Sequence, residues 1–69
     1  MHDNVYKTLE ITGSSKTSIE DAVQNAIKKT SKTVHNLRWF EVADVRGHLQ
    51  DDAIDYWQVT VKIGVTLDD

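Results

Sequence analysis

Two side chains in this sequence could together hold a flat heterocyclic ligand, and Trp39 is the first of them. It stands directly before Phe40, and adjacent residues of a strand point to opposite faces of the sheet. Phe40 can then join the core with Val42, while Trp39 shares the other face with Glu41. An indole on a charged face indicates either a contact between subunits or a platform on which a planar ring can stack.

Gln58 is the second such side chain. A primary amide carries a donor and an acceptor side by side, so it can pair with the N–H and C=O edge of a pyrimidine-like ring. The simpler interpretation is a polar residue on a solvated strand face. A hairpin that turns near Gln50 would leave Trp39 and Gln58 offset along it, so a shared ligand would require two subunits.

Arg46 could hold a phosphate or stack on a ring, and it could equally be a solvated charge near the end of a hairpin. Strict alternation places Arg46 on the same face as Phe40, so an outward role requires a bulge or a strong twist after Val42. Gly47 favours such an irregularity. A further group of cations could attract phosphate, although a solvated helix end explains them better: Lys28, Lys29 and Lys32.

The sequence offers little support for catalysis. It has no cysteine, no Gly-x-Ser-x-Gly elbow, and three histidines without evident Ser or Asp partners or zinc-site spacing. Residues 13–17 superficially resemble a phosphate loop but lack its glycine spacing. We therefore expect a binding protein rather than an enzyme, with no metal site.

The elements that must position these side chains can be predicted from hydrophobic periodicity. Residues 5–12 alternate as a half-buried strand that ends at residues 13–15. One amphipathic helix follows, with a capping box predicted from Thr17 to Glu20. Its apolar positions recur at steps of three and four residues: Ile19, Ala22, Val23, Ala26, Ile27, Thr30 and Val34.

A second strand is predicted from Leu37 to about Gly47, a turn at residues 50–52, and a long third strand over residues 54–67. One row of the third strand should face the helix: Trp57, Val59, Val61, Ile63, Val65 and Leu67. The order β-α-β-β predicts an α+β fold with a three-stranded antiparallel or mixed sheet and one helix on one face. The other face stays uncovered and should carry Trp39, Glu41, Tyr56, Gln58 and Thr60.

Length and charge narrow the class of protein. A chain of 69 residues is expected to form one domain, residues 1–69, and without cysteines it cannot be stabilised by disulfides. Self-association is then the leading source of extra stability. The net charge of -3 argues against nucleic acid as a partner. No long apolar run or signal-peptide pattern occurs, so we expect no membrane association and a cytoplasmic location.

Four segments taken together resemble the dodecins: residues 18–26 (SIEDAVQNA), 36–42 (NLRWFEV), 46–48 (RGH) and 56–59 (YWQV). The resemblance covers nearly the whole chain in order. It implies a small flavin-binding protein of bacterial type, with the β-α-β-β fold assembled as a hollow homo-dodecamer. The implied function is storage and sequestration of FMN or riboflavin, with quenching of the excited flavin.

The resemblance also implies residue roles. Trp39 is similar to the tryptophan that pairs across a two-fold axis to enclose two flavin rings, and Gln58 to the glutamine that hydrogen-bonds their pyrimidine edge. Arg46 matches an arginine placed near the flavin, and Asp44 and His48 lie where the family approaches the ligand's side chain. The alternative is an oligomeric shell or interaction protein that binds another ligand, such as coenzyme A, which part of the family binds.

Overall fold

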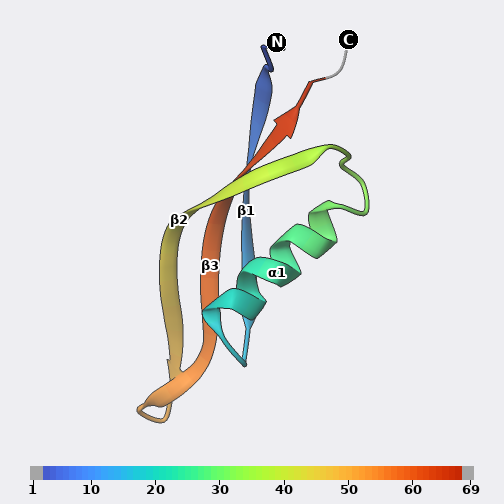
Figure 1. Ribbon diagram of the computed structural model, residues 1–69. Coiled ribbons are helices and arrows are strands. Elements are labelled where there is room, and N and C mark those ends of the chain that lie inside the picture. The colour runs from blue at the N-terminus through green and yellow to red at the C-terminus, as the bar shows by residue number, and fades with distance from the viewer. Residues whose placement is uncertain (1–2, 68–69) are drawn as a thin grey trace.

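The computed structural model describes residues 3–67 and consists of three strands and one helix in the order β-α-β-β. These elements are β1 (Tyr6–Ser15), α1 (Ile19–Thr30), β2 (Leu37–Gln50) and β3 (Ala53–Thr66). Both strand pairs are antiparallel and the sheet order is β1-β3-β2, so β3 is central (Figure 1). The predicted α+β fold with an antiparallel sheet is confirmed.

The start of α1 differs by one residue from the predicted cap. Ser18, not Thr17, is the N-cap, and its hydroxyl accepts a hydrogen bond from the Asp21 amide at 3.0 Å. The Thr17 amide instead donates to the Ser15 hydroxyl at 2.9 Å, and this hydroxyl donates to the Asp21 carboxylate at 2.6 Å. Glu20 lies in the first turn, where an acid suits the helix dipole, but it is not the partner of the cap.

β1 continues three residues beyond its predicted end, because Gly13 belongs to the strand and does not break it. Gly13 pairs with Val59 across the sheet. A Cβ added there would collide with the backbone of Ala22 and the side chain of Ala26. Glycine at this position therefore lets α1 approach the strand closely.

The β2–β3 hairpin is longer than predicted. β2 extends to Gln50 rather than to about Gly47, and the turn consists of Asp51 and Asp52. Both residues have positive φ, 52° and 65°, as a two-residue type I′ hairpin turn requires. Such a turn keeps both strands paired up to its ends, which explains the extra length.

The core lies between α1 and the two strands that the helix covers, β1 and β3 (Figure 1). Its buried side chains come from the predicted row of β3 and the predicted face of the helix: Val59, Val61, Ile63, Val65, Ala22, Val23 and Ala26. Trp57 at one end of the row is only half-buried, and Leu67 at the other end lies outside β3 and is exposed. Within residues 3–67, no helix is long and apolar enough to cross a membrane.

Candidate functional site

A β-bulge in β2 decides which side chains share the uncovered face of the sheet. The pairing of β2 with β3 shifts between Val42 and Asp44. Before the shift Trp39 lies opposite Gly64, and after it Arg46 lies opposite Gln58. Residues directly opposite each other in a sheet share a face. The bulge after Val42 is the irregularity that an outward Arg46 required, and it brings Arg46 onto the face of Gln58.

Trp39 rests on the central strand at Gly64. A Cβ added to Gly64 would collide with three indole atoms, Cε2, Cζ2 and Nε1, with Cε2 the nearest. Cε2 is bonded to both of the other atoms, and on the outer edge of the ring system it is recessed between them. A group that approached in the plane of the ring would therefore come closest to Nε1 or Cζ2, and not to Cε2. The Gly64 backbone thus lies under one face of the indole. The opposite face points away from the sheet, and Trp39 is 41% exposed.

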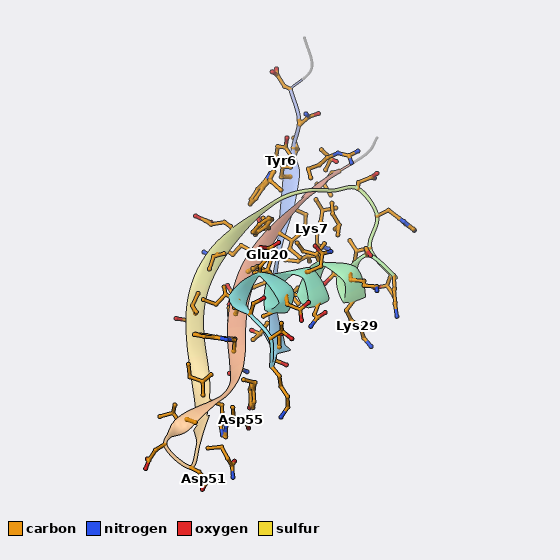
Figure 2. All side chains as sticks on the ribbon, turned by 60° about the horizontal axis from the view of Figure 1, so that its bottom comes forward. Tyr6, Lys7, Glu20, Lys29, Asp51 and Asp55 are labelled. Atoms are coloured by element: carbon orange, nitrogen blue, oxygen red, sulfur yellow. The ribbon has the colours of Figure 1, made fainter. Side chains whose placement is uncertain are left out.

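Tyr6 contacts the indole from the other side of β3. The two ring centroids are 5.9 Å apart and the ring planes meet at 61°, an edge-to-face arrangement. Tyr6 belongs to β1 and Trp39 to β2, so the central strand separates them. They meet because Gly64 carries no side chain between them. In Figure 2, Tyr6 lies at the end of the sheet opposite to Asp51.

Gln58 and Arg46 lie in a second, polar part of the uncovered face. The Arg46 guanidinium donates from Nε and Nη2 to the same Asp44 carboxylate oxygen, at 3.0 and 2.8 Å. Gln58 is half-buried beside a hollow of about 240 Å³. The hollow is lined by Ser14, Ser15, Lys16, Tyr56 and Gln58.

His48 is held by its own chain at the hairpin end of this polar part. Its ring stacks on Tyr56 with centroids 4.9 Å apart and planes 8° from parallel. Its Nδ1 lies 3.5 Å from one Asp55 oxygen, and Lys16 Nζ lies 3.2 Å from the other. Figure 2 shows Asp55 toward the same end as Asp51. His48 therefore lies with the polar group and not beside Trp39.

The structure brings four of the five predicted ligand residues together and leaves the fifth apart. The predicted offset between Trp39 and Gln58 is confirmed, because their positions on β3, Gly64 and Gln58, are six residues apart. At about 3.4 Å per residue, this separation is roughly 20 Å. It exceeds the length of a three-ring heterocycle, so one bound ring cannot touch both residues of the same chain.

Sequence reasoning missed the two residues that hold the indole, Gly64 and Tyr6. Gly64 interrupts a run of β-branched residues, which was a usable signal, but only the register with β2 places it under Trp39.

Among residues 3–67, no group of three or more His, Cys, Asp or Glu side chains could hold a metal ion. His2 lies outside these residues.

Known proteins share the fold of this chain. Residues 5–68 match the model of the family called Dodecin. The chain belongs to the dodecin family. A curated dodecin from Thermus thermophilus is 35% identical over 65 residues, which are 94% of each chain. The family predicted from the four sequence segments is confirmed.

Solved dodecins share the whole architecture. The dodecin from Streptomyces davaonensis superimposes with a TM-score of 0.92 at 44% identity, covering 99% of this chain and all of the other. The dodecin from Streptomyces coelicolor also has a TM-score of 0.92, at 38% identity, covering 100% of this chain and 99% of the other. This chain therefore contains every element of the dodecin fold.

Proposed function

We propose that this dodecin binds and stores flavin, FMN or riboflavin, by stacking it between the Trp39 side chains of two copies in a shell of twelve. The observation that carries this proposal is the one-sided platform at Trp39. One face of the indole lies on Gly64, and the other is directed away from the sheet. A planar ring can stack only on the free face.

A two-fold axis supplies what one chain lacks. In a symmetric pair, the same patch of each copy faces its partner. Two free indole faces then oppose each other and enclose two ligand rings between them. Each ring contacts one indole and the other ring, so no face of the stack is left to water. An indole that was stacked on both sides within its own chain would not support this arrangement.

Gln58 of another copy completes the site. Its distance from Trp39 along β3, roughly 20 Å, means that the amide serves a ring bound to a neighbouring platform. The amide pairs with the N–H and C=O edge of the flavin's pyrimidine ring. Arg46 and Asp44 flank this amide on β2, where they approach the polar side chain of the flavin, and His48 stands next to them.

The exposed apolar side chains of β2 support assembly from many copies. Phe40, Val42 and Val45 point to the helix side of the sheet, yet they are 50%, 45% and 42% exposed because α1 covers only β1 and β3. Leu49 and Ile54 at the hairpin end are more exposed still. Several exposed apolar side chains on one strand are typical of an interface between subunits. Covering them requires further copies of the chain.

Stacking also indicates what happens to the bound flavin. An electron-rich indole in van der Waals contact with an excited flavin can donate an electron and take it back, which returns the flavin to its ground state. Bound flavin is therefore dark and protected from photochemistry. Enclosure between two indoles leaves no room for a substrate at the ring, so the role is storage and not turnover.

The test is a titration of the purified apo-protein with riboflavin, FMN and, separately, coenzyme A. Flavin fluorescence reports binding, and size-exclusion chromatography with light scattering reports mass. Saturable quenching on a twelve-subunit species is expected. Bright emission from fully bound flavin would contradict the stacking mechanism. An intact shell that binds coenzyme A and no flavin would assign the shell to another ligand.

A further inference from the structure

We infer that Gly64 is a positioning residue for the Trp39 platform: the absence of a side chain at this point of the central strand sets the height and tilt of the indole. The ligand in this inference rests on the proposed flavin function. The seating of the indole on Gly64 does not, because it follows from contacts within one chain.

A glycine inside the central strand, at residue 64, calls for a structural explanation. Glycine weakens the interior of a strand, since it adds no packing and has more freedom to lose on folding. Gly64 lies in the centre of the sheet, between the β-branched Ile63 and Val65, and its φ is not positive. Backbone conformation therefore does not explain the glycine. The indole does, because any other residue would place a Cβ into the ring face.

The contact with Tyr6 makes the position of the ring well defined. Gly64 supports the indole from below, and the Tyr6 ring meets it edge-to-face at 61° from the β1 side. Both contacts depend on the same gap in the side chains of β3. A methyl group at residue 64 would lift or rotate the indole and break its contact with Tyr6. Because the stacked arrangement uses two copies of Trp39, the variant displaces both indoles and each enclosed ring loses contact with its own.

The experiment compares Gly64→Ala with Gly47→Ala, a matched control in the same hairpin. A Cβ at Gly47 would lie 3.7 Å from the Tyr56 carbonyl oxygen and 4.0 Å from Trp57 Cε3, which is ordinary van der Waals contact. The two variants make the same change to strand propensity and side-chain volume. Only the first places a methyl group against the Trp39 indole.

The first readout needs no ligand. The chain has two tryptophans, so in a Trp57→Phe background all tryptophan emission and indole near-ultraviolet circular dichroism come from Trp39. Gly64→Ala should shift the emission and change the dichroism of Trp39, and Gly47→Ala should leave both as in the parent. The second readout is flavin titration, for which we expect roughly three- to tenfold weaker binding and incomplete quenching with Gly64→Ala alone.

The outcomes separate this inference from the proposed function. If Gly64→Ala leaves the Trp39 signals and flavin binding like those of Gly47→Ala, the inference is overturned. If the Trp39 signals change while the parent protein binds no flavin, positioning stands and the flavin function fails. If Gly64→Ala prevents assembly, Tyr6→Leu tests the position of the indole without adding a side chain beneath it. Tyr6→Phe, which keeps the aromatic ring, is its control. An unaltered Trp39 signal in Tyr6→Leu would then overturn the inference.

Discussion

The two halves of this sheet differ in what covers them. α1 covers β1 and β3, and three side chains of β3 are fully buried beneath the helix: Val59, Val61 and Ile63. β2 pairs with β3 along its whole length, but not one of its side chains is buried. Most of the residues proposed to hold the ligand belong to β2, including Trp39 and Arg46. The chain thus separates the strand pair that stabilises it from the strand that carries most of the proposed ligand residues.

This difference links binding to assembly. A strand that its own chain leaves exposed on both sides offers both faces to other copies, and the proposed ligand would occupy part of the same surface. The covered half should therefore respond to mutation as an ordinary protein core. The β2 half should respond through assembly and through the ligand. Substitutions in each half test this separation.

The largest effect is expected from Val45→Asp. Val45 lies opposite the buried Val59 on the helix side of β2 and is 42% exposed. A carboxylate in the isolated chain would reach water at little cost. In an interface it would be buried without a partner, which costs several kcal/mol in every copy. We expect the shell to dissociate, as measured by light scattering.

Thr33→Asp is the control for Val45→Asp, since it adds the same charge at an exposed position of the loop after α1. It should assemble normally. An intact shell with Val45→Asp would mean that this face of β2 stays in water. Coverage by other copies would then not explain why β2 is exposed in the single chain.

The second prediction concerns the covered half. Ile63→Ala removes a side chain that is 1% exposed in the core under α1. Truncation of this kind costs about 2–5 kcal/mol of unfolding free energy. Val42→Ala, at a position of the neighbouring strand that its own chain leaves exposed, should weaken assembly and leave the unfolding free energy of the dissociated chain nearly unchanged. Chemical denaturation of both variants measures the difference, and equal losses would show that β2 is as deeply packed as β3.

The order of elements and the buried row of β3 could be predicted because they depend on local periodicity. Alternation over residues 54–67 and the helical spacing after Ile19 are properties of the sequence itself. The errors occurred where a contact between elements decided the outcome. Local pattern predicts a strand end at Gly13, because the role of this glycine in the approach of α1 is invisible in a single segment. The cap moved to Ser18 because Ser15 engages the Thr17 amide.

For the site, the residue types were readable and their arrangement was not. Alternation placed Trp39 and Gln58 on one face, and an outward Arg46 required a bulge whose exact register no local pattern specifies. The position of the Trp39 indole depends on its contacts with Gly64 and Tyr6. These three residues belong to three different strands. Their proximity follows from strand order and register. Those are properties of the pairing, so no single stretch of sequence contains them.

The third prediction tests the binding role of β2 without disturbing its interfaces. Trp39→Ala removes one stacking pair per ligand, worth on the order of 1 kcal/mol or more, so flavin should bind roughly five- to tenfold more weakly and remain brighter when bound. Trp57→Phe alters the other tryptophan and should bind as the parent does. Fluorescence titration and light scattering are measured together. Loss of the shell in Trp39→Ala would instead assign the indole to assembly.

The smallest effect is expected from Asp44→Asn. Asp44 holds the Arg46 guanidinium through two hydrogen bonds to one carboxylate oxygen, and both side chains are partly exposed, so the pair is worth at most about 1 kcal/mol. Without the carboxylate charge, Arg46 is freed for the phosphate of FMN, which riboflavin lacks. FMN binding should then strengthen roughly two- to fivefold relative to riboflavin, and added salt should remove the gain. Arg46→Gln should abolish it. Equal changes for both flavins would show that Arg46 does not reach the phosphate. The polar part of β2 would then contact only what FMN and riboflavin share.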